Sequence, residues 1–202
     1  MKKTLSALYL TTALVCGAAA PALAQQKGDM TLGLGLHWIE PDSSASTTTA
    51  GPVKVDGNAR PTLTFEYFLA DNVGLEVLAS WPFEHDINLV GTGKIGETKH
   101  LPPTVSLQYH FTNKSKITPF VGAGLNYTYF FDDTSPLGAL SLDESWGLAL
   151  HAGADFAINE KSSLRLDVRY IDIETDVRLG GAPIGKVKID PWVIGAAYVM
   201  KF

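Results

Sequence analysis

The sequence MTLGLGLHW occupies residues 30–38 and alternates strictly between two kinds of side chain. Every second residue from Met30 to Trp38 is large and apolar, and the residues between them are small or polar. Successive side chains of a β-strand point to opposite faces, so this period of two indicates a strand with one apolar face. The spacing of apolar residues that marks an amphipathic helix is absent here.

The same alternation recurs along the rest of the chain. The further alternating segments are residues 63–69, 73–81, 105–111, 121–129, 146–156, 164–170 and 192–202. About 9–11 residues cross a bilayer as a tilted strand, which is close to the length of these segments. Short polar turns at 70–72, 112–116 and 159–162 alternate with long links at 41–58, 83–100, 132–143 and 175–188. This alternation of short and long connections predicts an all-β fold, an eight-stranded antiparallel up-and-down transmembrane β-barrel with the long links as surface loops.

The two faces of these strands differ in polarity, and that difference separates two kinds of barrel. A soluble lipocalin-type barrel turns its apolar face inward, whereas an outer-membrane barrel turns it outward against lipid. One face here is nearly free of charge, and the other carries the ionisable residues. We therefore expect interior charges at Glu66, Glu76, Arg165 and Asp167, with the glutamates pairing with the arginines, because unpaired charge in a confined interior is costly.

Aromatic residues favour the membrane interpretation, because they gather at the two ends of the apolar face. If the first strand runs upward, the four tryptophans, Trp38, Trp81, Trp146 and Trp192, all lie at upper strand ends. Phe202 lies at a lower end. Two such belts are typical of the two interfaces of a bilayer. We expect outer-membrane lipids and lipopolysaccharide to surround the barrel.

The two ends of the chain predict its location. Residues 1–24 combine two lysines, an apolar run and a small-residue cleavage motif, which is typical of a signal peptide, so residues 25–202 form the barrel domain. The terminal Phe202, with apolar residues at alternate positions before it, looks like the signal read by the outer-membrane assembly machinery. We therefore expect a bacterial outer-membrane protein with its termini in the periplasm.

Several short sequences closely resemble the OmpW family of outer-membrane proteins. They are FEY at 65–67, DNVGLE at 71–76, LPPT at 101–104, PFVGAGLNYT at 119–128, DESWG at 143–147, YIDI at 170–173 and DPWV at 190–193. The resemblance implies a barrel with a hydrophobic channel that passes small hydrophobic molecules across the outer membrane. Some members of this family have been proposed to move other small solutes, including small amino acids, and several serve as receptors for bacteriocins or phage.

An eight-stranded barrel is about filled by its own side chains, so we expect solutes to leave sideways through the wall. Proline lacks the N–H that a strand ladder needs, which places a lateral opening at Pro82, Leu101, Pro102 and Pro103. The alternative is that these prolines simply end strands at loops.

The channel constriction is expected at five large inward residues, Phe68, Leu78, Phe120, Phe130 and Arg169. Leu78 stands where the family places a constricting apolar residue. Arg169 stands where relatives carry tryptophan, which makes this interior more ionic and argues against a strictly hydrophobic cargo. Ordinary interior packing is the alternative for all five.

Other functions find less support in the sequence. The net charge of −5, from 16 basic and 21 acidic residues, argues against nucleic-acid binding. We expect no cofactor and no metal, because His37, His110 and His151 lack the spacing of a metal site. His85 with nearby acids and loop serines does not make a catalytic triad, so we expect no enzyme. A non-transporting outer-membrane anchor or receptor is the main alternative to a channel.

Overall fold

The computed structural model describes residues 25–42, 46–49 and 51–202 and contains fifteen strands. The signal peptide expected at residues 1–24 lies outside the described residues. No helix in the described part of the chain is long and apolar enough to span a membrane. The strands are β1 (Met30–Glu40), β2 (Thr47–Thr48), β3 (Gly51–Val55), β4 (Asn58–Ala70), β5 (Val73–Ser80), β6 (Phe83–Leu89), β7 (Gly93–Leu101), β8 (Thr104–His110), β9 (Ile117–Thr134), β10 (Leu140–Leu142), β11 (Ser145–Asn159), β12 (Ser162–Ile171), β13 (Glu174–Leu179), β14 (Ala182–Lys188) and β15 (Trp192–Lys201).

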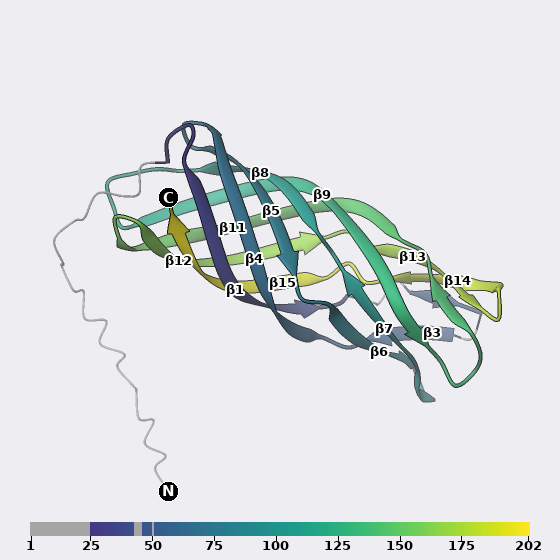
Figure 1. Cartoon of the computed structure of the whole chain (residues 1–202). Coiled ribbons are helices and arrows are strands. Elements are labelled where there is room, and N and C mark those ends of the chain that lie inside the picture. Colours follow the sequence, from purple (N-terminus) through teal and green to yellow (C-terminus); the bar gives the residue numbers. More distant parts are fainter. Residues whose placement is uncertain (1–24, 43–45, 50) are drawn as a thin grey trace, which may run out of the picture.

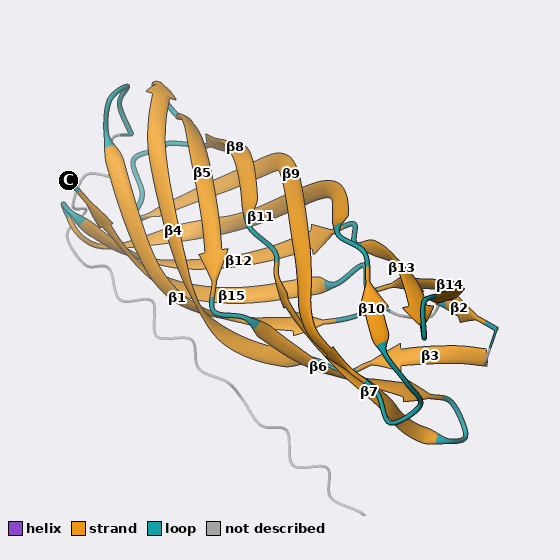
Figure 2. Ribbon diagram, turned by 45° about the vertical axis from the view of Figure 1, so that its right-hand side comes forward, coloured by secondary structure: helices purple, strands orange, loops and turns teal. Residues whose placement is uncertain are grey.

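Eight of these strands form a closed antiparallel barrel, which confirms the predicted fold (Figures 1 and 2). In chain order they are β1, β4, β5, β8, β9, β11, β12 and β15. The first and last strands pair with each other, with Leu34 opposite Tyr198, so no edge is left open. The amide of Phe202 donates to the carbonyl of Met30 at 3.0 Å, which places both ends of the barrel chain together.

The outer surface of the barrel is apolar, as the alternation predicted. Leu36, Trp146 and Ile194 point outward and are each more than half exposed. Such a surface is incompatible with water and fits the acyl chains of a bilayer. Aromatic rings contact one another at its upper rim, where Tyr170 and Trp192 have ring centroids 5.4 Å apart.

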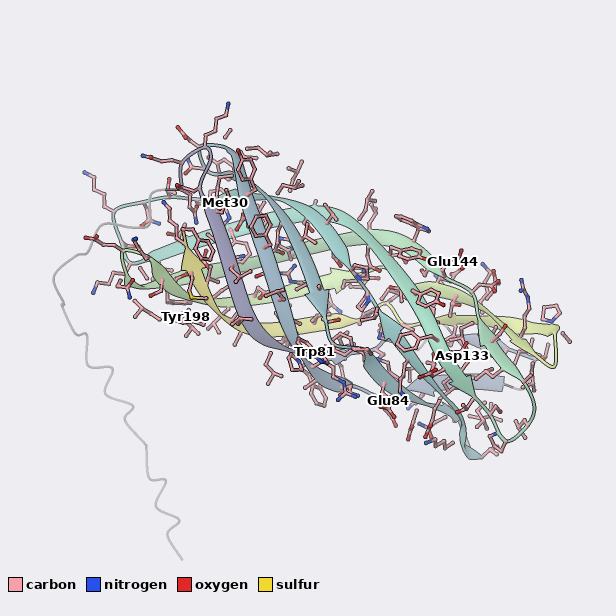
Figure 3. All side chains as sticks on the ribbon, in the orientation of Figure 1. Met30, Trp81, Glu84, Asp133, Glu144 and Tyr198 are labelled. Carbon is pink, nitrogen blue, oxygen red and sulfur yellow. The ribbon has the colours of Figure 1, made fainter. Side chains whose placement is uncertain are left out.

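The long links are not irregular loops, which corrects that expectation. They form β2, β3, β6, β7, β10, β13 and β14, and with the upper end of β9 these strands build a second, smaller arrangement on top of the barrel. We call it the upper ring. Figure 3 shows Trp81 near the boundary, Glu84 and Asp133 beyond it, and Met30 and Tyr198 at the opposite end of the barrel.

The reason for the difference lies in a second set of alternating apolar residues within the links. Phe83 and Ile87 of β6 and Val53 of β3 point into the ring and are buried, while Glu84 and Lys54 point to solvent. The links can therefore bury an apolar face of their own, and this burial favours strands over loops.

The polarity of the ring is thus opposite to that of the barrel below it. The barrel is apolar outside and polar inside, whereas the ring is polar outside and apolar inside. The change falls at the tryptophan belt, because the ring stands in water and the barrel in lipid.

Candidate functional site

Charged side chains from four strands meet inside the barrel. We call them the ion network, and they are Glu66, Glu76, Asp155, Arg165, Asp167 and Arg169. Four carboxylates therefore face two guanidinium groups, and all six residues are buried. The structure brings together the four interior charges that the alternation pointed to, with Asp155 and Arg169 beside them.

Arg165 is the centre of the network. Its Nε donates to Asp155 Oδ1 at 2.8 Å, and its Nη1 donates to Glu76 Oε2 at 2.9 Å. Its Nη2 reaches both Asp155 Oδ2 at 2.9 Å and Glu66 Oε2 at 3.4 Å. The guanidinium also lies over the Phe120 ring, with Cζ 4.5 Å from the centroid. A buried charge with this many partners is tolerated, whereas loss of one partner leaves the others uncompensated.

Arg169 forms the upper edge of the network. Its Nε donates to Asp167 Oδ2 at 2.6 Å and its Nη1 to Glu76 Oε1 at 2.7 Å. The next inward residue above it on the same strand is Ile171, which is buried and belongs to the apolar core of the ring. Arg169 therefore marks the level at which the polar interior meets the apolar one.

Two interior histidines pack against glycines of the neighbouring strand. His151 on β11 is opposite Gly122 on β9, and His37 on β1 is opposite Gly195 on β15. A Cβ atom at either glycine would collide with the imidazole ring. These glycines therefore make room for the rings in an interior that is otherwise full.

The five residues expected to form a constriction all point inward and are buried, but they lie at different levels. Phe68 is near the lower end, where its ring is 5.3 Å from that of His110. Phe120 lies beside the ion network, and Leu78 is the last inward residue of β5 to pair with β8. Phe130 lies above the barrel, in the apolar core of the ring. These five side chains therefore do not form one constriction at a single height in the barrel.

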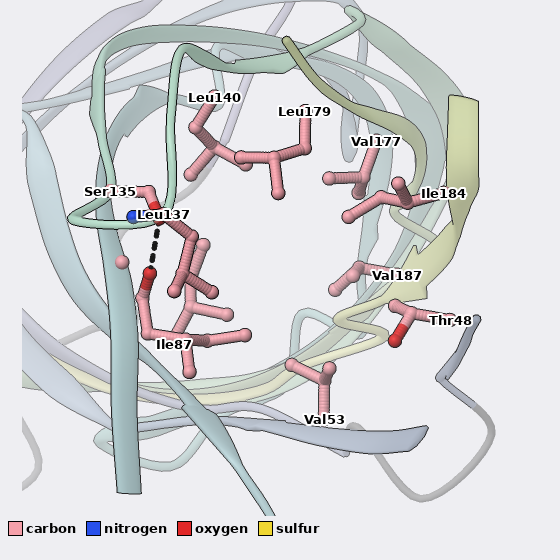
Figure 4. Close-up of a pocket in the computed structure, with 12 residues that line it drawn as sticks. Thr48, Val53, Ile87, Ser135, Leu137, Leu140, Val177, Leu179, Ile184 and Val187 are labelled. Carbon is pink, nitrogen blue, oxygen red and sulfur yellow. Dashed lines mark hydrogen bonds between the residues drawn. The ribbon is translucent and has the colours of Figure 1, made fainter. Parts of the chain in front are cut away.

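The upper ring contains an apolar pocket (Figure 4). The space inside it that a water-sized sphere can occupy is about 60 Å³, smaller than the roughly 300–1,000 Å³ that is common for ligand pockets. Its lining residues are almost all apolar. They are Thr48, Val53, Ile87, Ile95, Gly96, Ser135, Leu137, Leu140, Val177, Leu179, Ile184 and Val187.

The apolar side chains of this pocket continue as a packed core down to the barrel. Val53, Ile87 and Val187 line the pocket and also belong to one buried cluster with Ile39 and Val193 at the top of the barrel strands. No single sequence segment signals this path, because its members come from every link. The alternation of apolar residues in 83–89 and 174–179 indicates strands there, although the glycines and charges around them predict loops.

A gap in the strand ladder opens beside this path. β5 and β8 pair up to Leu78 and Thr104, and β6 and β7 begin to pair at Phe83 and His100. Within the described residues, no ladder pair joins residues 79–82 to residues 101–103. The residues expected at a lateral opening, Pro82, Leu101, Pro102 and Pro103, lie on the two sides of this gap.

Three carbonyl groups of the gap have hydrogen-bond partners that do not lie across it. The Pro82 carbonyl accepts from Arg60 Nε at 2.8 Å, and the Pro103 carbonyl accepts from the Tyr127 amide at 3.0 Å. The Asn126 amide group donates to the Pro102 carbonyl at 3.1 Å. Because these three carbonyls have partners on their own side of the gap, they do not need partners across it.

Within residues 25–42, 46–49 and 51–202, no group of three or more potential ligand side chains is arranged to hold a metal ion. Among the described histidines, His85 and His100 contact each other in the upper ring, which the sequence did not indicate. The Nε2 atoms of their imidazoles are 3.0 Å apart.

Comparison with known proteins agrees with this geometry. The model of the OmpW family matches residues 26–202. Outer membrane protein W of Vibrio cholerae is 39% identical, and the match covers 100% of both chains. The dibenzothiophene metabolism operon protein PahQ of Pseudomonas aeruginosa is 27% identical, again over 100% of both chains. The crystal structure of OprG from Pseudomonas aeruginosa superposes with a TM-score of 0.78 at 30% identity, covering 90% of this chain and 99% of OprG.

These matches, with the closed lipid-facing barrel, identify a protein of the bacterial outer membrane rather than an enzyme. In such barrels the short turns face the periplasm, so the upper ring lies on the extracellular side. The chain belongs to the OmpW family.

Proposed function

We propose that the protein admits small apolar molecules from outside the cell and releases them sideways into the outer membrane. They enter the pocket of the upper ring, pass down its apolar interior and leave through the gap between residues 79–82 and 101–103. Leu78 and Arg169 form the floor of this path, and Phe130 narrows it from above. Phe120 and Phe68 pack beneath the floor.

The observation that carries this proposal is the position of the gap. Phe83, at the upper border of the gap, belongs to the same buried apolar cluster as Ile87 in the pocket. Below the gap, the ion network fills the barrel with hydrogen-bonded charge. Burial among these apolar side chains lowers the free energy of an apolar solute by about 25 cal/mol per Å² of apolar surface removed from water, whereas the ion network offers no such stabilisation.

The name of one relative supports an apolar cargo. PahQ is named for an operon of dibenzothiophene metabolism, and dibenzothiophene is a flat apolar heterocycle. The match spans the whole of both chains, so the ring and the gap lie within the shared region.

The test is uptake by cells whose outer membrane carries the protein, with naphthalene and glycine as parallel probes. We expect faster entry of naphthalene, and about fivefold slower entry in a Val177→Ser variant, because serine places a hydroxyl in the apolar pocket. Val177 is buried in the pocket, and its exposed neighbour Arg178 provides the matched control, Arg178→Ser. Entry of glycine alone would favour a channel for small amino acids. Entry of neither probe would favour a receptor or anchor.

The partners of the barrel follow from its surface. We propose that lipopolysaccharide and outer-membrane lipids contact the tryptophan belt. We also propose that the assembly machinery binds the outward face of β15 together with the exposed Phe202 that follows it. A Phe202→Ala variant should accumulate unfolded in the periplasm, whereas Trp146→Ala should assemble. Normal assembly of both variants would contradict this role for Phe202.

A further inference from the structure

Two buried histidines lie between the pocket and the gap. His85 on β6 and His100 on β7 are 1% and 0% exposed. Their Nε2 atoms are 3.0 Å apart. The His100 ring stacks on Phe130 with centroids 5.6 Å apart, and Phe83 packs against the same imidazole. Two polar rings thus stand among aromatic side chains.

The position of these rings relates them to the path of a solute. His100 is the ladder partner of Phe83, and this pair forms the upper border of the gap. Ile87, two residues beyond His85 on the same face of β6, lines the pocket. A molecule that moves from the pocket to the gap therefore passes both imidazoles.

The hydrogen bonds of the pair have a defined direction. His85 Nδ1 lies 2.5 Å from the carbonyl oxygen of Asp56, and a carbonyl oxygen only accepts, so Nδ1 carries the hydrogen. Burial lowers the pKa of His85 below its ordinary value and lowers the pKa of His100 much further, so both rings are neutral at pH 7. A neutral ring has one N–H, which leaves His85 Nε2 as an acceptor and makes His100 Nε2 the donor.

His100 Nδ1 is then an acceptor, and it has no hydrogen-bond partner among the described residues. A buried acceptor without a partner is destabilising. A single water molecule is a poor partner here, because a buried water needs about two to four polar contacts, and the rings of Phe83 and Phe130 flank this imidazole.

We propose that His100 Nδ1 accepts a hydrogen bond from the hydroxyl group of apolar alcohols and phenols as they pass, and so makes them the preferred cargo. This inference rests on the proposed function and names its substrate class. The free lone pair requires a donor, so an alkane gains nothing from it and a carboxylate is repelled by it. An ammonium donor would lose its hydration in an apolar wall.

The test compares 1-naphthol with naphthalene, which differ by one hydroxyl group. Binding is measured to the mature protein in lipid nanodiscs, in excess of binding to nanodiscs without protein. We expect 1-naphthol to bind about fivefold more tightly than naphthalene through one net hydrogen bond. His100→Phe keeps an aromatic ring but removes the lone pair, so the two probes should bind equally. The control Phe83→Leu should retain the preference.

A second measurement does not depend on a variant. In protein labelled with ¹⁵N at histidine, the His100 Nδ1 resonance should be that of an unprotonated nitrogen, and it should shift with 1-naphthol but not with naphthalene. A protonated Nδ1 in the free protein would overturn the inference, and so would a hydroxyl preference that survives in His100→Phe. Equal binding of both probes to the unaltered protein would overturn the inference and leave the proposed function standing. Binding of neither probe would count against the proposed function itself.

Discussion

Leu78 and Thr104 form the last ladder pair between β5 and β8, and above them the two strands separate. The next pair, Phe83 with His100, already belongs to the upper ring. Pro102 and Pro103 connect β7 of the upper ring to Thr104, the first residue of β8 in the barrel wall. The gap is therefore bordered by two strands that cannot complete the ladder, since proline has no N–H to donate.

Restoring donors at the gap should slow the uptake of apolar molecules. The variant Pro102→Thr/Pro103→Val gains two backbone N–H groups and can extend the pairing of β8 toward residues 79–82. We expect naphthalene uptake by cells to fall several-fold in this variant. Pro119→Thr is the matched control, because Pro119 lies in the barrel near the lower end of β9. Unchanged uptake in a correctly folded double variant would exclude the gap as the exit.

Removing the centre of the ion network should destabilise the barrel. Arg165→Met leaves Glu66, Glu76 and Asp155 without their shared guanidinium, and we expect the free energy of unfolding to fall by about 3–5 kcal/mol. Adding Asp155→Leu removes one of the uncompensated carboxylates, so the double variant should be more stable than Arg165→Met alone. Urea unfolding in lipid vesicles measures both. A loss below about 1 kcal/mol for Arg165→Met would contradict a structural role for the network.

Lowering the pH should loosen the β6–β7 hairpin. Burial lowers the pKa values of His85 and His100. Arg60 lowers the pKa of His85 further, whereas Asp56 and Asp86 partly oppose this shift. Below the ordinary histidine pKa of 6.5, both imidazoles bind protons in the unfolded hairpin but stay neutral in the folded hairpin. The folded form therefore loses stability as the pH falls through 6.5 toward the lowered values, and it is unaffected above pH 7.

Amide hydrogen exchange at pH 7.5 and 5.5, corrected for the intrinsic rate, measures this change. A His85→Phe/His100→Phe variant should lose the pH dependence, because it carries no titrating ring at this position. Equal protection of the β6–β7 amides at both pH values in the unaltered protein would contradict the prediction.

The tryptophans should report one depth in the membrane. The chain contains four tryptophans, and Trp38, Trp81, Trp146 and Trp192 are all exposed at the upper rim of the barrel. Lipids brominated near the headgroup should therefore quench the fluorescence more strongly than lipids brominated near the chain ends. Stronger quenching by the deeply brominated lipids would show that the belt does not lie at the interface.

The strands of the barrel could be predicted because their signal is local. Residues 30–38 and 192–202 show their apolar and polar faces without reference to any other segment. The same alternation identified Glu66, Glu76 and Arg165 as inward side chains, since parity along a strand assigns each residue to a face.

The upper ring was missed because its alternation is shorter and mixed with loop residues. Phe83, His85 and Ile87 alternate as regularly as barrel residues do, but the glycines and charges around them are typical of loops. The sequence analysis assigns the apolar face of every strand to the outside of the barrel. This assignment does not hold for the upper ring, where the apolar face points inward.

The sequence by itself determined which residues form membrane strands and which face of each strand meets lipid, because a period of two is a property of adjacent residues. Only the tertiary structure decided the register in which the strands pair and the strands that the long links form above the barrel. That choice brings Arg165 to Glu76, which is 89 residues away in the chain, and sets His100 against His85 beside the gap. Such contacts depend on barrel closure and strand stagger. Both are properties of the complete set of paired strands, so the sequence of a single strand does not specify them.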